Sequence, residues 1–194
     1  MSTKRKTHSR DKEKMADPVT TTITAYVWDV DDPNAKEILD DFMEQIGSAI
    51  PKGAHLDSSG DLVVEMTTEK ETPPFSFWNV VAPDDLEKYF DIEGKETKSG
   101  TTYSYDWNVE HWGTKWDAEM LDVEMEYDES TEERKVHYTF TTPWVPPIPF
   151  FKALVAKWPE LTFSIIWEQY GYDGDDHGAE YDGSNGILEE INSW

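Results

Sequence analysis

Residues 119–141 decide the fold: they read Glu-Met-Leu-Asp-Val-Glu-Met-Glu-Tyr-Asp-Glu-Ser-Thr-Glu-Glu-Arg-Lys-Val-His-Tyr-Thr-Phe-Thr. From Leu121 to Tyr127 the odd positions are apolar and the even positions are charged, and in 134–141 apolar and polar residues alternate again. A period of two is that of a strand with one face in water. Since the polar residues 128–133 can form a turn between the two runs, the stretch predicts an antiparallel hairpin.

A strand, a helix and a further strand are expected before the hairpin. Residues 20–28 are rich in β-branched and aromatic types, which favours a strand. Asp32 and Pro33 open a helix, because the carboxylate can accept first-turn amides and proline loses nothing at the first helical position. Apolar residues then recur at helical spacing as far as Gly47, so this helix should lie on a sheet. Residues 75–81 predict another buried strand.

A second helix and a last strand are expected after the hairpin. Prolines at 143, 146, 147 and 149 lead into a helix with apolar residues from Phe151 to Trp158, and residues 161–167 predict the strand. This order satisfies the split βαβ pattern. The sequence therefore predicts an α+β, ferredoxin-like βαββαβ sandwich, an antiparallel sheet with two helices on one face. Residues 83–118 would form a long insertion between its halves.

The length of 194 residues fits one domain, and its composition suggests three parts. Residues 1–17 are rich in Lys and Arg and are expected to be a disordered basic arm. Residues 18–170 form the predicted ferredoxin-like domain. Residues 171–194 are acidic and glycine-rich and are expected to be an appendage that ends in a short helix at 187–191.

The charge restricts the partners. Asp and Glu number 41 against 17 Lys and Arg, a formal net charge of −24. Duplex DNA and anionic membranes both require a basic patch, so neither is an expected partner of the folded body. With no cysteine and no apolar run of about 18 residues, a soluble protein in the cytoplasm of the host cell is expected. The candidate acidic surface comprises Asp122, Glu124, Glu126, Asp173, Asp175 and Asp176.

A tryptophan-rich segment, residues 107–117, is the candidate binding site. Its indoles offer flat stacking surfaces, its glycine permits a tight turn, and Lys115 offers a cation beside Asp117. Two interpretations remain open: a ligand-binding loop, or indoles that fill the core while Lys115 pairs locally. The candidate residues are Trp107, Asn108, His111, Trp112, Gly113, Thr114, Lys115, Trp116 and Asp117, together with Trp144.

No catalytic or cofactor motif stands out. The sequence lacks a Gly-x-x-x-x-Gly-Lys-Ser/Thr loop, a Gly-x-Gly-x-x-Gly turn and a Gly-x-Ser-x-Gly elbow. His111 has no second histidine at zinc-ligand spacing. We therefore expect no catalytic residues, no metal and no cofactor.

Four stretches carry a resemblance. They are Trp112-Gly113-Thr114-Lys115-Trp116-Asp117-Ala118 after Tyr105-Asp106-Trp107-Asn108, Phe75-Ser76-Phe77-Trp78-Asn79-Val80-Val81-Ala82-Pro83, Thr142-Pro143-Trp144-Val145-Pro146-Pro147-Ile148-Pro149, and Trp158-Pro159-Glu160-Leu161-Thr162-Phe163. Over roughly residues 20–178 the chain resembles the YubB ferredoxin-like domain family of plasmid- and phage-borne proteins. The resemblance implies a ferredoxin-like fold and a home on a mobile genetic element. It implies no activity.

Two functional hypotheses follow. The first is a non-enzymatic accessory or counter-defence protein whose acidic, DNA-mimic-like surface binds a basic host protein, an encounter that Coulomb steering would accelerate. The second is a nucleotide- or oligonucleotide-binding domain that uses the aromatic segment Trp107–Asp117.

Overall fold

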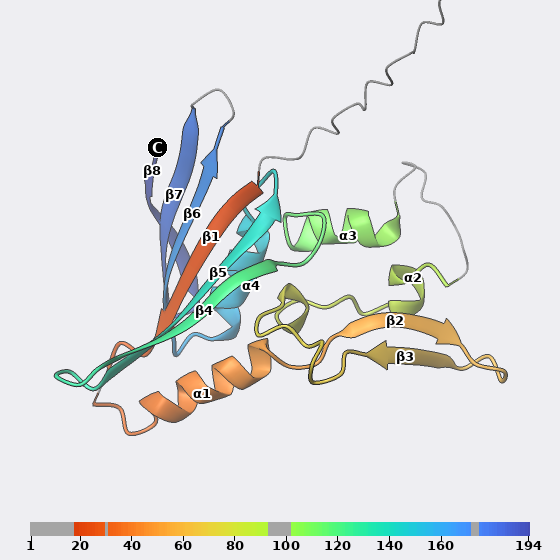
Figure 1. Ribbon diagram of the computed structural model, residues 1–194, viewed down its shortest axis with the longest axis horizontal. Helices are drawn as coiled ribbons and strands as arrows, with labels where there is room; N and C mark the ends of the chain where they lie inside the picture. The colour runs from red at the N-terminus through yellow and green to blue at the C-terminus, as the bar shows by residue number, and fades with distance from the viewer. Residues whose placement is uncertain (1–17, 30, 93–101, 172–174) are drawn as a thin grey trace, which may run out of the picture.

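Strands dominate the computed structural model, which describes residues 18–29, 31–92, 102–171 and 175–194 (Figure 1). The expected basic arm, residues 1–17, lies outside the described residues. Six strands form the large sheet: β1 (Pro18–Tyr26), β4 (Glu119–Asp128), β5 (Glu133–Pro143), β6 (Thr162–Tyr170), β7 (Asp176–Ser184) and β8 (Ile187–Ser193). All neighbouring pairs are antiparallel, in the order β4-β5-β1-β6-β7-β8.

The remaining elements are four helices, a 3-10 turn and a small hairpin. The helices are α1 (Ala35–Ile46), α2 (Leu86–Tyr89), α3 (Tyr103–His111) and α4 (Ile148–Lys157). The 3-10 helix η1 spans Phe77–Asn79, and β2 (Pro51–Leu56) pairs with β3 (Leu62–Met66) in a separate two-stranded sheet.

The predicted hairpin forms one edge of the large sheet. Asp128 pairs with Glu133 across the β4–β5 turn, which confirms the hairpin. The elements β1, α1, β4, β5, α4 and β6 follow one another in βαββαβ order, and β1 lies between β5 and β6 in the sheet. The sheet is therefore a split βαβ arrangement with two further strands added beside β6.

Both long helices cover one face of the sheet. Phe42 of α1 contacts Tyr138 and Phe163 edge to face, with ring centroids 6.1 and 5.8 Å apart. Phe151 of α4 lies 6.3 Å from Tyr181 of β7. The strand pairings put Tyr138, Phe163 and Tyr181 on the same face of the sheet, so α1 and α4 pack on one face, as expected.

The expected strand at 75–81 is wrong. Its apolar residues do enter the core, but the chain forms η1 instead: the Ser76 side chain caps the turn by accepting from the Trp78 amide, at 3.2 Å. Phe77 stacks on Phe150 at 3.9 Å between centroids. The strand that follows α1 in the large sheet is β4, so the whole stretch 47–118, rather than 83–118, lies between the two.

Two further expectations about helices differ from the structure: where the first helix starts, and whether residues 187–191 are helical. The first helix begins at Ala35, because the Asp32 carboxylate accepts from the Asn34 amide at 2.8 Å and thereby forms a turn before the helix. The expected short helix at 187–191 is wrong. Asn185 and Gly186 both have positive φ, 51° and 77°, which suits a two-residue hairpin turn, and the following residues pair with β7 as strand β8.

Candidate functional site

The face of the large sheet opposite the helices is the open face. Along β1 the odd-numbered residues 19–25 are buried and the even-numbered Thr20, Thr22, Thr24 and Tyr26 are only half-buried. Directly paired residues share a face. One row across the whole open face therefore comprises Glu124, His137, Thr24, Ser164, Asp182 and Glu189.

Carboxylates flank the threonines of the open face on both sides. The exposed carboxylates on this face of β4 include Asp122, Glu124 and Glu126, and those on β7 and β8 include Asp182 and Glu189. The predicted Asp122, Glu124 and Glu126 thus share one face. Asp175 and Asp176, at the start of β7, are also exposed, and Asp173 lies outside the described residues.

Few cations face these carboxylates. Lys135 Nζ lies 3.2 Å from Glu133 Oε2, and His137 Nε2 lies 3.1 Å from Glu126 Oε2. His137 Nδ1 also lies 2.9 Å from Thr24 Oγ1. No Lys or Arg follows Lys157 in the sequence, so β6, β7 and β8 contribute acids without any permanent cation. The open face is therefore strongly negative.

Sequence reasoning missed the contribution of β7 and β8 to this face. Glu180, Asp182 and Glu189 are not among the sequence candidates, because residues 171–194 are predicted to be an appendage. Glu168 of β6 is a further open-face carboxylate that the candidates omit. The Asn185-Gly186 pair was the available signal, since it is typical of a two-residue β-hairpin.

The tryptophan-rich segment is largely core. Trp107 and Trp112 are buried. Trp112 Nε1 donates to the Val81 carbonyl at 2.9 Å, and its ring meets Phe77 edge to face at 5.8 Å. Because a buried indole with a satisfied N–H has no free stacking face, these two residues stabilise the fold rather than offering a binding surface.

Asn108 and Gly113 fix the turn that follows α3. Asn108 Nδ2 donates to the Lys115 carbonyl at 2.8 Å, while its Oδ1 accepts from Tyr89 Oη at 2.9 Å. Gly113 has φ 83°, and a Cβ there would lie 2.5 Å from Pro149 Cδ. Thr114 is buried beside them. Only glycine fits this combination of backbone angle and close approach.

Asp117 joins the turn to η1. Its carboxylate accepts from Ser76 Oγ, from the Phe77 amide at 2.7 Å and from the Ala118 amide at 2.7 Å. Burial raises the pKa of this carboxyl above its ordinary value, and the hydrogen bonds from Ser76, Phe77 and Ala118 partly oppose that shift. The expected local pairing of Lys115 with Asp117 is absent from the ion pairs found among the described residues.

His111 packs against Trp107, one turn earlier in α3. Its ring stacks on Trp107 at 4.2 Å, and Nδ1 lies 2.9 Å from the Trp107 carbonyl oxygen. Within the described ranges, no group of three His, Asp or Glu side chains is placed to hold a metal ion.

Lys115, Trp116 and Trp144 form the accessible part of the candidate site. Lys115 Nζ lies 3.0 Å from the centroid of the Trp144 ring, a cation–π contact. Trp144 has φ 63°, in the region that glycine favours, and both it and Trp116 are exposed. The structure therefore brings Lys115 and Trp144 together and separates them from the buried indoles.

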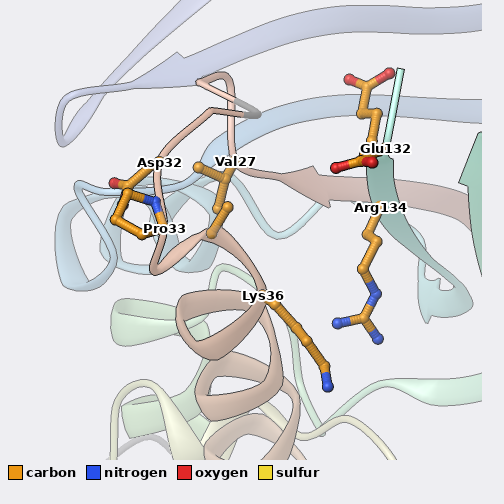
Figure 2. Close-up of a pocket in the computed structure, with 8 residues that line it drawn as sticks. Val27, Asp32, Pro33, Lys36, Glu132 and Arg134 are labelled. Atoms are coloured by element: carbon orange, nitrogen blue, oxygen red, sulfur yellow. The ribbon is translucent and has the colours of Figure 1, made fainter. Parts of the chain in front are cut away.

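A pocket of about 160 Å³ lies at the other end of the sheet, between the start of α1 and the β4–β5 turn (Figure 2). Its charged lining residues include Lys36, Arg134 and Glu132, and Figure 2 shows Lys36 and Arg134 extending to the same side. Arg134 Nη1 lies 3.1 Å from Asp40 Oδ1. Because Arg134 is paired with Asp40 and the lining also holds Glu132 and Glu133, the pocket offers no concentrated site for an anion.

Comparison with known proteins gives a match to a family model over part of the chain. Residues 111–193 match the family model of the ferredoxin-like domain in Api92-like protein. No curated protein matches the chain. One solved structure, the crystal structure of a protein api92 from Yersinia pseudotuberculosis, matches with 14% identity and a TM-score of 0.34. The match covers 48% of this chain and 32% of that chain.

The match places a ferredoxin-like domain in the C-terminal region and names Api92-like proteins rather than the YubB family of the earlier resemblance. It starts at the end of α3 and takes in β4, β5, α4, β6, β7 and all of β8, and its five strands build most of the open face. Among the described helices, none has the length and apolar character needed to cross a membrane.

Proposed function

We propose that this protein is a non-enzymatic accessory or counter-defence protein of a phage or plasmid that binds a basic host protein through the open face of its sheet. The observation that carries the proposal is the row from Glu124 to Glu189, which has acids at both ends and one basic side chain, that of His137. The resemblance to the YubB family supports the mobile genetic element.

The electrostatics of the open face favour a basic protein as the partner. A face that is negative at both edges raises the local concentration of cationic partners and speeds their association, and salt weakens the effect. The same field opposes the approach of duplex DNA or of an anionic membrane. Duplex DNA is also negatively charged. The negative open face would therefore compete with DNA for a DNA-binding protein.

The nucleotide-binding alternative has less support. Of its four indoles, Trp107 and Trp112 are buried, which leaves Trp116 and Trp144 accessible. Lys115 already lies over the Trp144 ring. A base that stacked on Trp144 would have to displace that cation first, so the geometry favours the open face.

The experiment is an affinity capture from host lysate with two triple variants of equal charge. The open-face triple is Glu124→Gln, Asp182→Asn and Glu189→Gln; the control triple is Glu37→Gln, Asp41→Asn and Glu44→Gln, all exposed on α1. Each triple removes three negative charges. Wild type and the control triple should retain the same basic protein at low salt, whereas the open-face triple should retain several-fold less.

Identical loss in both triples would mean that net charge alone drives retention, and the open face would not be the site. Retention that survives molar salt unchanged would also contradict the proposal, since screening shortens the Debye length to about 3 Å at 1 M.

A further inference from the structure

An aromatic platform lies on the open face at β6, β7 and β8. Glu168 of β6 pairs with Gly178 of β7, and the Gly178 amide and carbonyl each hydrogen-bond to Trp194 at 3.1 Å. A Cβ at Gly178 would lie 2.3 Å from Trp194 Cζ2, so the indole crosses directly over the glycine. One face of the indole therefore covers the backbone, and the ring remains 49% exposed.

Two more side chains complete the platform on the same face. Ile166 and Tyr170 stand two residues to either side of Glu168 on β6, and they are 38% and 62% exposed. We define the aromatic platform as Ile166, Tyr170 and Trp194 around Gly178. Exposed apolar side chains that gather on one face and are rimmed by polar groups mark interaction surfaces.

Carboxylates surround the platform. Glu168 lies opposite Gly178, Glu180 pairs with Ile166, and Asp176 pairs with Tyr170. Tyr170 Oη donates to Glu168 Oε2 at 3.1 Å, which holds the phenol ring beside that carboxylate. No Lys or Arg occurs from residue 158 to residue 194, so β6, β7 and β8 carry no permanent cation of their own.

We infer that the aromatic platform anchors an arginine side chain of the basic partner. This inference rests on the proposed function. A guanidinium is planar and weakly hydrated: it stacks on aromatic faces and binds carboxylates through two parallel N–H bonds. Indole and phenol surfaces beside Glu168, Glu180 and Asp176 offer both interactions. A lysine ammonium is more strongly hydrated and cannot make the bidentate contact, so arginine is preferred.

The charge argues against a second copy of this chain as the occupant. Two platforms facing each other would bring like carboxylates together, which is destabilising. A cationic segment of another protein would instead be attracted to the carboxylates around the platform.

The test uses two peptides of eight residues, one of arginine and one of lysine, titrated into the full-length protein by calorimetry. Wild type should bind the arginine peptide several-fold more tightly than the lysine peptide. Trp194→Ala should reduce this preference to near parity. Trp116→Ala removes an indole of nearly the same exposure, 51%, from outside the platform and should leave the preference unchanged.

Because Trp194→Ala can loosen β8, Glu180→Gln serves as a second variant that keeps the indole, and it should also lower the arginine preference. Equal affinity for both peptides in wild type, or an unchanged preference in both variants, would overturn the anchor while leaving the acidic face intact. Failure of both peptides to bind would instead remove the basis of the proposed function. A dimer of the free protein that Trp194→Ala dissociates would show that a second copy occupies the platform and would overturn the inference.

Discussion

At the scale of single residues, Asp117 connects parts of the chain that are 40 residues apart. Its carboxylate accepts hydrogen bonds from Ser76 Oγ and the Phe77 amide, at the start of η1, and from the amide of the neighbouring Ala118. A buried carboxylate with three donors is held in place, but its charge is costly to bury. The residue therefore stabilises the fold through its hydrogen bonds more than through its charge.

Asp117 gives a prediction of pH dependence. Burial raises its pKa above 3.8, so the folded protein keeps this proton to a higher pH than the unfolded chain does. The contribution of the carboxyl to the free energy of unfolding is therefore greatest below pH about 4 and declines as pH rises through the folded pKa. Asp117→Asn cannot ionise, so its stability relative to wild type should improve as pH rises above about 4. Urea unfolding at several pH values measures this.

Asp117→Ala is the matched comparison, because it leaves the donors of Ser76, Phe77 and Ala118 unpaired. We expect a loss of about 1–3 kcal/mol below pH about 4, and the loss should become smaller as pH rises, because this variant also lacks the ionisable carboxyl. A relative stability of Asp117→Asn that falls as pH rises would show that the folded pKa is lowered instead.

Gly113 gives a second prediction at the residue scale. Gly113→Ala combines φ 83° with a clash at Pro149 and should cost about 2–4 kcal/mol of unfolding free energy. Gly60→Ala is the control, because Gly60 has φ 86° but nothing within 4 Å of the added Cβ, and it should cost about 1–2 kcal/mol. Equal losses in the two variants would exclude the close approach of Pro149 as a constraint.

At the scale of elements, the segment 75–81 shows how a tightly packed turn can imitate a strand. Phe77 stacks on Phe150 and meets Phe140 at 5.5 Å, so η1 fills the space between α4 and the sheet. The 3-10 helix η1 is therefore part of the main core, although it is not one of the split βαβ elements.

Phe77→Ala should destabilise the protein by about 3–5 kcal/mol, because it opens a cavity within the aromatic core. Val63→Ala, on the exposed part of β3, should change stability by less than about 0.5 kcal/mol. Thermal or urea unfolding compares them. A small loss for Phe77→Ala would mean that η1 is only loosely attached to the core.

The periodic elements were predictable from sequence, and the packed irregular ones were not. The alternation around Val123 and Val136 specified β4 and β5, because a one-residue shift would turn every apolar side chain to water. Phe75–Val81 has no such period, and its structure depends on Asp117, a contact distant in sequence. The same limit applies to the candidate site: Trp107 and Trp112 offered stacking surfaces by composition, and only their burial shows that they belong to the core.

At the scale of the whole molecule, the hairpin β7–β8 determines where many of the acidic side chains lie. By itself a net charge of −24 describes solubility as well as recognition. Pairing of β7 with β6 carries Glu180 and Asp182 onto the open face that also bears Glu124. These three carboxylates thus lie on one surface, opposite the face that the helices cover.

The association rate gives a prediction at this scale. With the captured basic protein as partner, raising the ionic strength from about 0.05 to 0.5 M should slow association by at least tenfold, since exposed charges are screened over shorter distances. Stopped-flow fluorescence measures the rate. A rate that does not change with salt would contradict electrostatic steering.

Carbodiimide labelling of carboxylates, with and without that partner bound, tests the central claim most directly. Protection should concentrate on Glu124, Asp182 and Glu189 of the open face, while Glu37, Asp41 and Glu44 of α1 react equally in both states. Protection of the α1 carboxylates with the open face still fully reactive would contradict the account.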